Sequence, residues 1–135
     1  MGISRLWAVQ RNELSEAWPH VEKLVIDALD YGTSRVGVKD VYDGIGTGRY
    51  QLWIAWGPAA EGIAVTEILD TEKERIASVF ICVGKNLKEW LRHLSSIEAW
   101  AKAEGCGVIE AWARPGWERV LKDYKKTHVQ LEKNL

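Results

Sequence analysis

Two lysines lie where a predicted strand runs into a predicted helix, in the segment VGKNLKEWL. Lys85 and Lys88 flank Asn86 at the expected start of this helix. The free N–H groups and the dipole of a helix N-terminus favour a negative charge, and lysines add point charges. The junction therefore predicts an anion site. A solvated helix end explains the same residues, since Asn86 and Glu89 have the spacing of a capping box.

The helix that carries this junction has the clearest periodicity in the chain. Its apolar residues recur at intervals of three and four, which is typical of a helix with one buried face; they are Leu87, Trp90, Leu91, Leu94, Ile97, Trp100 and Ala101. Trp90 fits this buried stripe. Gly105 follows at the place where a helix usually ends.

The remaining elements alternate between helical and strand periodicity. Three strands at 50–56, 62–69 and 75–83 predict an antiparallel meander. We expect a strand at 3–9, a helix at 16–31 with Ser15 as N-cap, a short helix ending at 44–48, a strand at 108–113, a helix at 117–124 and a strand at 127–131. The predicted fold class is α+β, of the layered α/β type, with helices on both faces of a mixed, mostly antiparallel sheet.

Composition narrows the function classes. The chain has 135 residues, which predicts one domain over 1–135. Its net charge of -1 gives no positive field for nucleic acid or anionic membrane, and no apolar run reaches the length of a membrane span. We expect a cytoplasmic protein with reduced thiols at Cys82 and Cys106. The three histidines and two cysteines lack ligand spacing, so no metal is expected.

Eight tryptophans stand against a single phenylalanine. Each indole brings a large apolar area and one N–H that needs a partner. Core filling is the simplest interpretation. A ligand groove or a partner surface explains the same composition.

Two segments of the sequence resemble the GNAT acyltransferase superfamily, as does the order of the elements. The first, IEAWAKAEGC at 97–106, resembles the end of that family's central helix, where an alanine, three variable residues, glycine and cysteine lead into the next strand. The second, GWERVLKDY at 116–124 with VQLEK at 129–133, resembles the family's last helix and returning strand. The topological resemblance covers almost the whole chain.

This resemblance implies acetyl-CoA bound in a cleft between two splayed parallel strands. The strand Ile76–Val83 would pair with the pantetheine arm, and the helix start after Gly84 would hold the pyrophosphate. The cofactor-binding residues that the resemblance implies are Cys82, Val83, Gly84, Lys85, Asn86 and Lys88.

The resemblance also implies a direct attack of an amine on the thioester. Tyr124 matches the tyrosine that protonates the leaving thiolate. A carboxylate, either Glu67 or Glu110, would act as the base, and no motif chooses between them.

The chain departs from the family at the pyrophosphate loop. The family pattern Arg/Gln-x-x-Gly-x-Gly/Ala places its glycines on Lys88 and Trp90, whose side chains would take the space where phosphates approach the backbone. The Gly-Phe pair after the family tyrosine is replaced by Lys125-Lys126-Thr127. The standard phosphate cradle is therefore expected to be absent.

Two functions from different classes follow. The first is an acyl-CoA-dependent N-acyltransferase with a degenerate pyrophosphate loop, acting on a small-molecule or protein amine. The second is a non-catalytic protein that keeps the fold for assembly with other subunits, in a virion or a homo-oligomer. The composition and the tail GW…LEKNL are similar to small GNAT-like proteins encoded by bacteriophages, which favours host cytoplasm or virion as the location.

Both functions depend on one spatial expectation. The third meander strand and the strand beginning near Val108 must lie side by side, in parallel, and part at one end.

Overall fold

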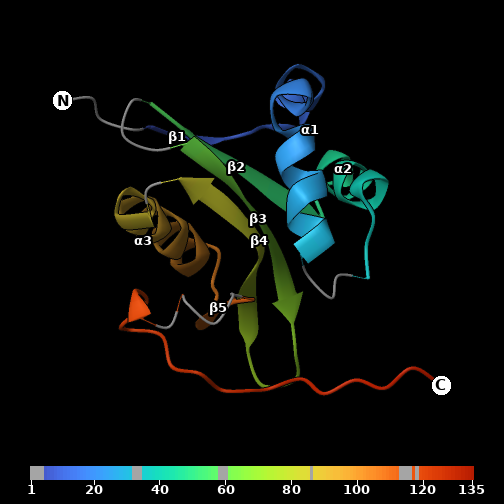
Figure 1. Ribbon diagram of the computed structural model, residues 1–135. Helices are drawn as coiled ribbons and strands as arrows, with labels where there is room; N and C mark the ends of the chain where they lie inside the picture. The colour runs from blue at the N-terminus through green and yellow to red at the C-terminus, as the bar shows by residue number, and fades with distance from the viewer. Residues whose placement is uncertain (1–4, 32–34, 58–60, 86, 113–116, 118) are drawn as a thin grey trace.

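A five-stranded sheet in the order β1-β2-β3-β4-β5 forms the centre of the molecule (Figure 1). The computed structural model describes residues 5–31, 35–57, 61–85, 87–112, 117 and 119–135, with the side chains of 31 and 87–89 outside that description. The elements are β1 (Arg5–Ala8), a 3-10 turn (Arg11–Glu13), α1 (Leu14–Tyr31), α2 (Val38–Thr47), β2 (Tyr50–Trp56), β3 (Glu61–Asp70), β4 (Arg75–Lys85), α3 (Leu87–Ala103) and β5 (Val108–Ala111).

The strand pairing confirms the predicted fold class. Strands β1 to β4 pair antiparallel with their neighbours, which is the expected meander. Strand β5 then pairs with β4 in parallel, from Ile76 opposite Val108 to Val79 opposite Ala111. A parallel neighbour requires a crossover, and α3 supplies it. The expectation that these two strands lie side by side and in parallel is confirmed.

The end of α3 places β5 in register with β4. Gly105 takes a left-handed conformation with φ +85°, and the Cys106 N–H donates to the Ala101 carbonyl at 3.0 Å. This six-to-one bond is the mark of a Schellman cap, which glycine favours because it has no Cβ. The next N–H, of Gly107, donates to the Arg75 carbonyl at 2.9 Å and brings the chain to the edge of β4.

The helices cover opposite faces of the sheet (Figure 1). On one face α1 and α2 pack on the sheet through a mostly aliphatic buried layer, in which Val21, Val25 and Val41 of the helices meet Leu52, Ile63 and Val65 of the strands. On the other face α3 packs on Trp53, Ala55, Ala64 and Val79 with its own Trp90 and Ile97. Because side chains alternate along a strand, each strand serves both layers. We call these the α1 face and the α3 face.

The predicted N-cap at Ser15 is wrong. Helix α1 begins at Leu14, directly after the 3-10 turn, so Ser15 lies inside the helix. The Gln10 N–H donates to the Glu13 carboxylate at 2.8 Å, and this bond satisfies one of the free donors at the start of the turn. Pro19 accordingly lies in the second turn of α1.

The second helix ends in the glycine-rich segment, as expected. Gly48 follows α2 with φ +86°, and its N–H donates to the Ile45 carbonyl at 3.1 Å. Gly44 lets α2 lie close to the sheet, because an added Cβ would stand 2.2 Å from the ring of Tyr50. The run of glycines is therefore a packing and capping feature of α2.

The two elements predicted at the C-terminus are wrong. Where a helix was predicted at 117–124, the described residues form two separate turns: the Val120 and Leu121 N–H groups both donate to the Trp117 carbonyl, and the Tyr124 N–H donates to the Leu121 carbonyl. Residues 127–131 are extended and belong to no strand, and Val129 and Leu131 are 69% and 90% exposed. A helix of two turns is marginal by itself. Period-two alternation makes a strand only where a partner edge is in reach.

The tryptophans divide between core and surface. Trp18, Trp53 and Trp90 are buried, whereas Trp56 and Trp112 are 45% and 63% exposed. Trp18 and Trp53 donate to Glu22 and Thr66. Core filling thus accounts for the buried indoles, and two large apolar side chains remain at the surface. In the described part of the chain, no helix is long and apolar enough to cross a membrane.

Candidate active site

The two carboxylates named from the sequence lie in one row across the sheet. Glu67 of β3 pairs with Ser78 of β4, and Ser78 pairs with Glu110 of β5. Directly opposite residues in a sheet point to the same face. Since Ile109 and Ala111 pack on the α3 face, the row points to the α1 face. Two strand spacings separate Glu67 from Glu110, about 10 Å between Cα atoms.

A β-bulge lies directly beyond this row. Val65 pairs with Ile81, while the next residue, Thr66, pairs with Val79. Phe80 is therefore an extra residue on β4, and an extra residue bends a strand and breaks the local ladder. Beyond the bulge, odd-numbered residues of β4 turn to the α1 face.

The contact between β4 and β5 ends at the same level. The last bond is from the Trp112 N–H to the Val79 carbonyl, at 3.0 Å. Strand β4 continues through Lys85, with no partner from β5 within the described ranges. The pairing between the parallel strands β4 and β5 therefore ends at the bulge.

A cavity of about 690 Å³ opens where the two strands separate. It is lined on the α1 face by Tyr50, Glu67, Phe80 and Glu110, and on the α3 face by Val79, Trp90, Leu94 and Ile97. A cavity that reaches both layers can hold two reactants that meet between the strands. Its size falls within the range of small-molecule sites.

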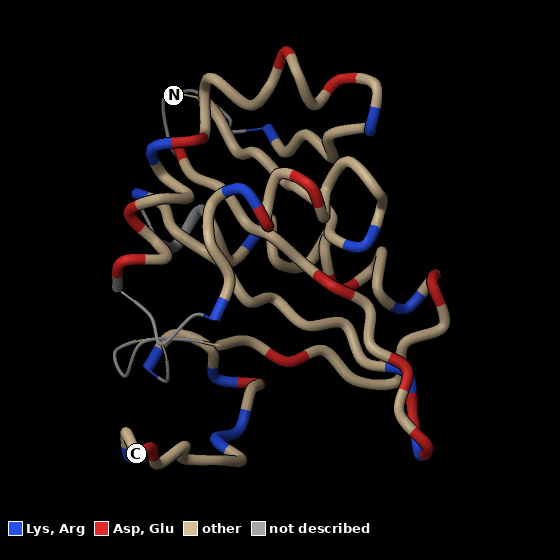
Figure 2. The backbone as a smooth tube through the Cα atoms, turned by 90° about the vertical axis from the view of Figure 1, so that its right-hand side faces the viewer, with Lys and Arg blue, Asp and Glu red and all other residues tan. Residues whose placement is uncertain are grey.

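The charges around the cavity are largely paired. The Arg49 guanidinium donates to Glu67 at 2.9 Å, and this hydrogen bond raises the pKa of Arg49. Arg35 pairs with Glu132 at 3.0 Å. The Glu110 carboxylate has no hydrogen bond or ion pair with any residue that the structure describes. Elsewhere, acidic and basic residues are interspersed along the chain (Figure 2). Glu110 is thus the carboxylate left available inside the cavity.

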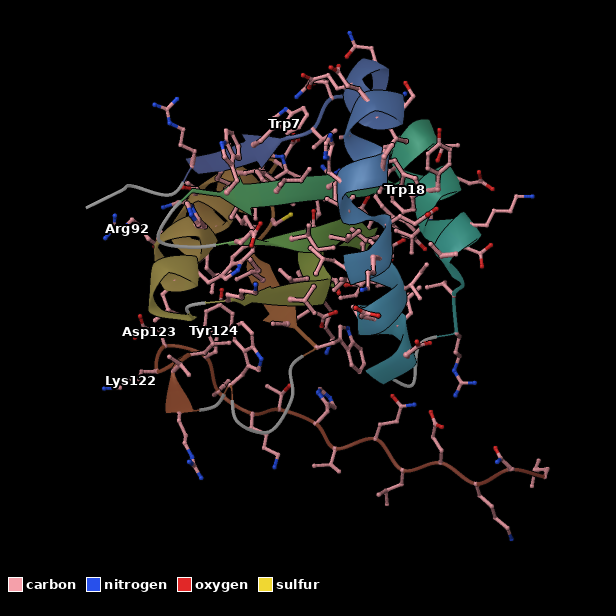
Figure 3. All side chains as sticks on the ribbon, turned by 45° about the horizontal axis from the view of Figure 1, so that its top comes forward. Trp7, Trp18, Arg92, Lys122, Asp123 and Tyr124 are labelled. Carbon is pink, nitrogen blue, oxygen red and sulfur yellow. The ribbon has the colours of Figure 1, made fainter. Side chains whose placement is uncertain are left out.

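Tyr124 lies on the α3 side of the sheet (Figure 3). Its hydroxyl donates to Glu98 of α3 at 2.6 Å. Burial, together with this bond to a carboxylate, raises the pKa of Tyr124. Tyr124 is absent from the described lining of the cavity. The role of Tyr124 as the acid stays a prediction. In this structure its hydroxyl proton is already engaged in the hydrogen bond to Glu98.

The predicted cofactor residues follow the far end of β4. Cys82 and Val83 line the cavity, and burial raises the pKa of the Cys82 thiol to about 12. Gly84 is exposed at the strand end, and Lys85 stands 3.9 Å from Glu61. Asn86 and the side chain of Lys88 lie outside the described residues. Both cysteines are free, and burial keeps Cys82 a neutral thiol rather than a nucleophile.

Trp90 points into the core, although its position matches a family glycine. Its indole is 3% exposed and packs on two glycines that face each other across β3 and β4. An added Cβ at Gly84 would lie 1.8 Å from Trp90 Nε1, and one at Gly62 would lie 2.5 Å away. The buried Nε1 has no hydrogen-bond partner among the residues that the structure describes. The indole is therefore accommodated by the strands and does not stand on the solvent side of the helix start.

Sequence reasoning missed Gly62, Ser78 and Arg49. A glycine inside a strand is a sign of close approach, so Gly62 and Gly84 could have been matched to a bulky partner. The row through Ser78 required the register between β3, β4 and β5. No group of three His, Cys, Asp or Glu side chains in the described chain could hold a metal ion.

No protein-family model and no curated protein matches the sequence. Solved structures do match. An aminoglycoside acetyltransferase from an uncultured soil metagenomic sample, solved with sisomicin, superposes with a TM-score of 0.72 at 9% identity and covers 98% of this chain and 97% of its own.

Two further similar structures were solved with acetyl-CoA or CoA. A protein of Clostridium acetobutylicum described as a predicted acetyltransferase, solved with acetyl-CoA, gives a TM-score of 0.66 at 15% identity, with 98% and 96% covered. The aminoglycoside N-acetyltransferase AAC(6')-Iy, in complex with CoA, gives 0.67 at 11% identity, with 99% and 96% covered. At such identities the likeness shows the fold alone. The chain has the fold of the GNAT-type acetyltransferases, as the resemblance implied.

Proposed function

We propose that this protein is an acyl-CoA-dependent N-acyltransferase. The observation that carries the proposal is the cavity that opens to both faces of the sheet where β4 and β5 separate. One face can receive the acyl donor and the other the amine, with the reacting atoms between the strands. Holding both reactants in this way removes much of the entropic cost of a bimolecular reaction.

The residues of β4 fit the cofactor. Beyond Val79 the strand lies along the cavity without a partner from β5 in the described chain, so its backbone is available to an amide-rich arm such as pantetheine. The start of α3 would hold the pyrophosphate, since helix N-termini bind phosphate. Trp90 leaves that end uncovered because its indole is buried on Gly62 and Gly84. Acetyl-CoA, when bound, supplies an acyl thioester whose C–S bond breaks as the new C–N bond forms.

Glu110 is the better candidate for the base. It lines the cavity and has no partner among the described residues, whereas Glu67 is held by Arg49. A carboxylate beside the entering ammonium group takes its proton and leaves the neutral amine that can attack a thioester. The leaving group is a thiol with a pKa near 8.5, so departure of the thiolate needs little acid assistance. The reaction therefore does not depend on Tyr124, which is bonded to Glu98.

The proposal is tested first by cofactor binding. We expect acetyl-CoA to raise the melting temperature, because a ligand at a hundred times its Kd stabilises a fold by about 2.7 kcal/mol. Lys88→Glu should reduce this shift, since it reverses a charge in the first turn of α3. Lys73→Glu, the same charge reversal in the exposed turn between β3 and β4, is the matched control. If millimolar CoA leaves both the melting curve and the tryptophan fluorescence unchanged, the proposal is wrong.

Glu110→Gln then tests the chemistry. We expect thiol release in the presence of an amine to fall by about 10²-fold or more, in line with loss of a general base. Binding of acetyl-CoA should be unchanged. Equal activity of the wild type and Glu110→Gln would assign the base elsewhere, with Glu67→Gln as the next variant.

A non-catalytic assembly role is the second candidate, and exposed apolar side chains favour it. Trp112 follows the edge strand β5, and Val129 and Leu131 lie on the extended tail. An unpaired strand edge together with exposed apolar residues is a common docking surface for another chain. This role predicts a defined oligomer in sedimentation, which Trp112→Ser with Leu131→Ser would dissociate. A strictly monomeric protein would contradict it.

A further inference from the structure

We infer that the acyl acceptor is a monoamine with an apolar or aromatic body, and not a polycation. This inference rests on the proposed function and concerns the α1 side of the same cavity. Among the residues that the structure describes, three features of that side select the acceptor: one carboxylate without a partner, two arginines that are already paired, and an apolar wall.

The carboxylates of the cavity offer one place for an ammonium group. Glu67 is neutralised by Arg49 at 2.9 Å, and Glu110 is unpaired in the described chain. A polyamine or an aminoglycoside carries several ammonium groups, each of which loses hydration on entering a cavity and needs its own partner. One available carboxylate satisfies one ammonium. Extra positive charges would remain uncompensated.

The arginines at the rim of the cavity are neutralised by glutamates. Arg35 and Arg49 both line the cavity, with side chains 78% and 67% exposed, so they stand at its rim. Each is already paired with a glutamate, Arg35 with Glu132 and Arg49 with Glu67. The rim is therefore balanced and does not attract a polycation, and it offers no unpaired cation to a substrate carboxylate. An acceptor with one ammonium group leaves no positive charge without a carboxylate partner, and it needs no unpaired cation at the rim.

The wall of the α1 side is apolar. Ala28 and Leu29 of α1, together with Val36, line it as half-buried side chains. Tyr50 and Phe80 form an aromatic pair with centroids 4.8 Å apart, directly beside the row that carries Glu110. Burying an apolar body against such a wall contributes about 25 cal/mol per Å². The structure thus matches an ammonium at Glu110 with a hydrocarbon or ring toward Tyr50 and Phe80.

An acceptor panel tests the inference with the full chain and acetyl-CoA. The probes are 2-phenylethylamine, propylamine, phenylalanine, spermidine and kanamycin, and the readout is kcat/KM from thiol release. We expect 2-phenylethylamine to exceed every other probe at least tenfold. The advantage over propylamine should lie in KM, because both carry the same ammonium group. If spermidine, kanamycin or phenylalanine is the best acceptor, the inference is wrong while the proposed function stands.

Binding without turnover gives a second test. Titration of 2-phenylethylamine into the complex with CoA, followed by calorimetry, should show binding that Glu110→Gln weakens at least tenfold. Glu72→Gln should bind the amine as the wild type does, and both variants should melt as the wild type does. Equal binding by Glu110→Gln would overturn the acceptor site. Failure of CoA itself to bind would remove the proposed function and this inference together.

Discussion

The two faces of the sheet are built in different ways. The α1 face buries mostly aliphatic side chains of moderate size beneath two helices, among them Val25, Val41 and Ile63, with Trp18 and Tyr50 beside them. The α3 face has one helix and relies on large indoles, with Trp53 and Trp90 buried. Many small contacts tolerate the loss of one member, whereas a few large contacts need matched shapes. The faces should therefore differ in their response to substitution.

The largest expected effect is that of Trp90→Ala. Loss of a buried indole leaves a large cavity and should lower the free energy of unfolding by about 3–5 kcal/mol. Val25→Ala on the α1 face should cost about 2 kcal/mol. Urea denaturation of both variants gives the comparison, and Trp112→Ala, at an exposed position, controls for loss of an indole as such. If the two substitutions lower the free energy of unfolding equally, the two faces do not differ in their response to substitution.

Replacing glycine by alanine should change the free energy of unfolding in opposite directions on the two faces. Gly84→Ala forces a Cβ to 1.8 Å from Trp90 Nε1 and should destabilise by about 1–3 kcal/mol. Gly46→Ala, in α2, meets only Leu14 at 3.8 Å and should stabilise by about 0.5–1 kcal/mol, because alanine favours a helix. Chemical denaturation measures both. Combining Gly84→Ala with Trp90→Leu should recover part of the loss, and a failure to do so would remove Trp90 as the cause.

Loss of a buried hydrogen bond on the α3 face should have the next largest effect on the free energy of unfolding. Trp53 Nε1 donates to the Thr66 hydroxyl at 3.0 Å, and both side chains are buried. Thr66→Val leaves the indole N–H without its acceptor and should cost about 1–2 kcal/mol. Thr66→Ser keeps the hydroxyl and is the control. Thermal melts in which Thr66→Ser is the more damaging change would contradict this role of the bond.

Alkaline pH should weaken the α3 face through Cys82. Burial raises the pKa of this thiol from its ordinary value of 9.0 to about 12. In the window from about 9 to about 12 the unfolded chain loses the thiol proton while the native chain keeps it, so stability falls as pH rises. Melting temperatures of Cys82→Ala should fall less steeply in that window and run parallel to the wild type at pH 6–8. Identical slopes throughout would show that Cys82 does not contribute.

The smallest effect is expected at the rim of the α1 face. Arg35 and Glu132 form an exposed ion pair, and such pairs contribute little. Arg35→Ala should change the free energy of unfolding by less than about 0.5 kcal/mol. A larger change, measured by urea denaturation, would indicate that the C-terminal tail is held more firmly than this pair suggests.

Local pattern predicted most of the fold. The meander at 50–85 and the helix at 87–103 follow from period-two and period-3.6 spacing with glycine at the ends, and these agree with the structure. The C-terminal elements failed because an amphipathic pattern of eight or five residues forms an element only when something packs on it. Tyr124 was assigned from its place in the sequence, yet its hydroxyl is bonded to Glu98, a partner that only the packed helix supplies.

The sequence by itself, through the predicted strands and the family resemblance, named Glu67 and Glu110 as the two candidate bases without choosing between them. It also determined the order of elements that forces β5 to lie parallel to β4. Only the tertiary structure decided that Arg49 neutralises one carboxylate and leaves the other available. The physical reason is register: one residue of slip turns a side chain to the opposite face, and register is set by pairing between distant segments and by the extra residue at Phe80.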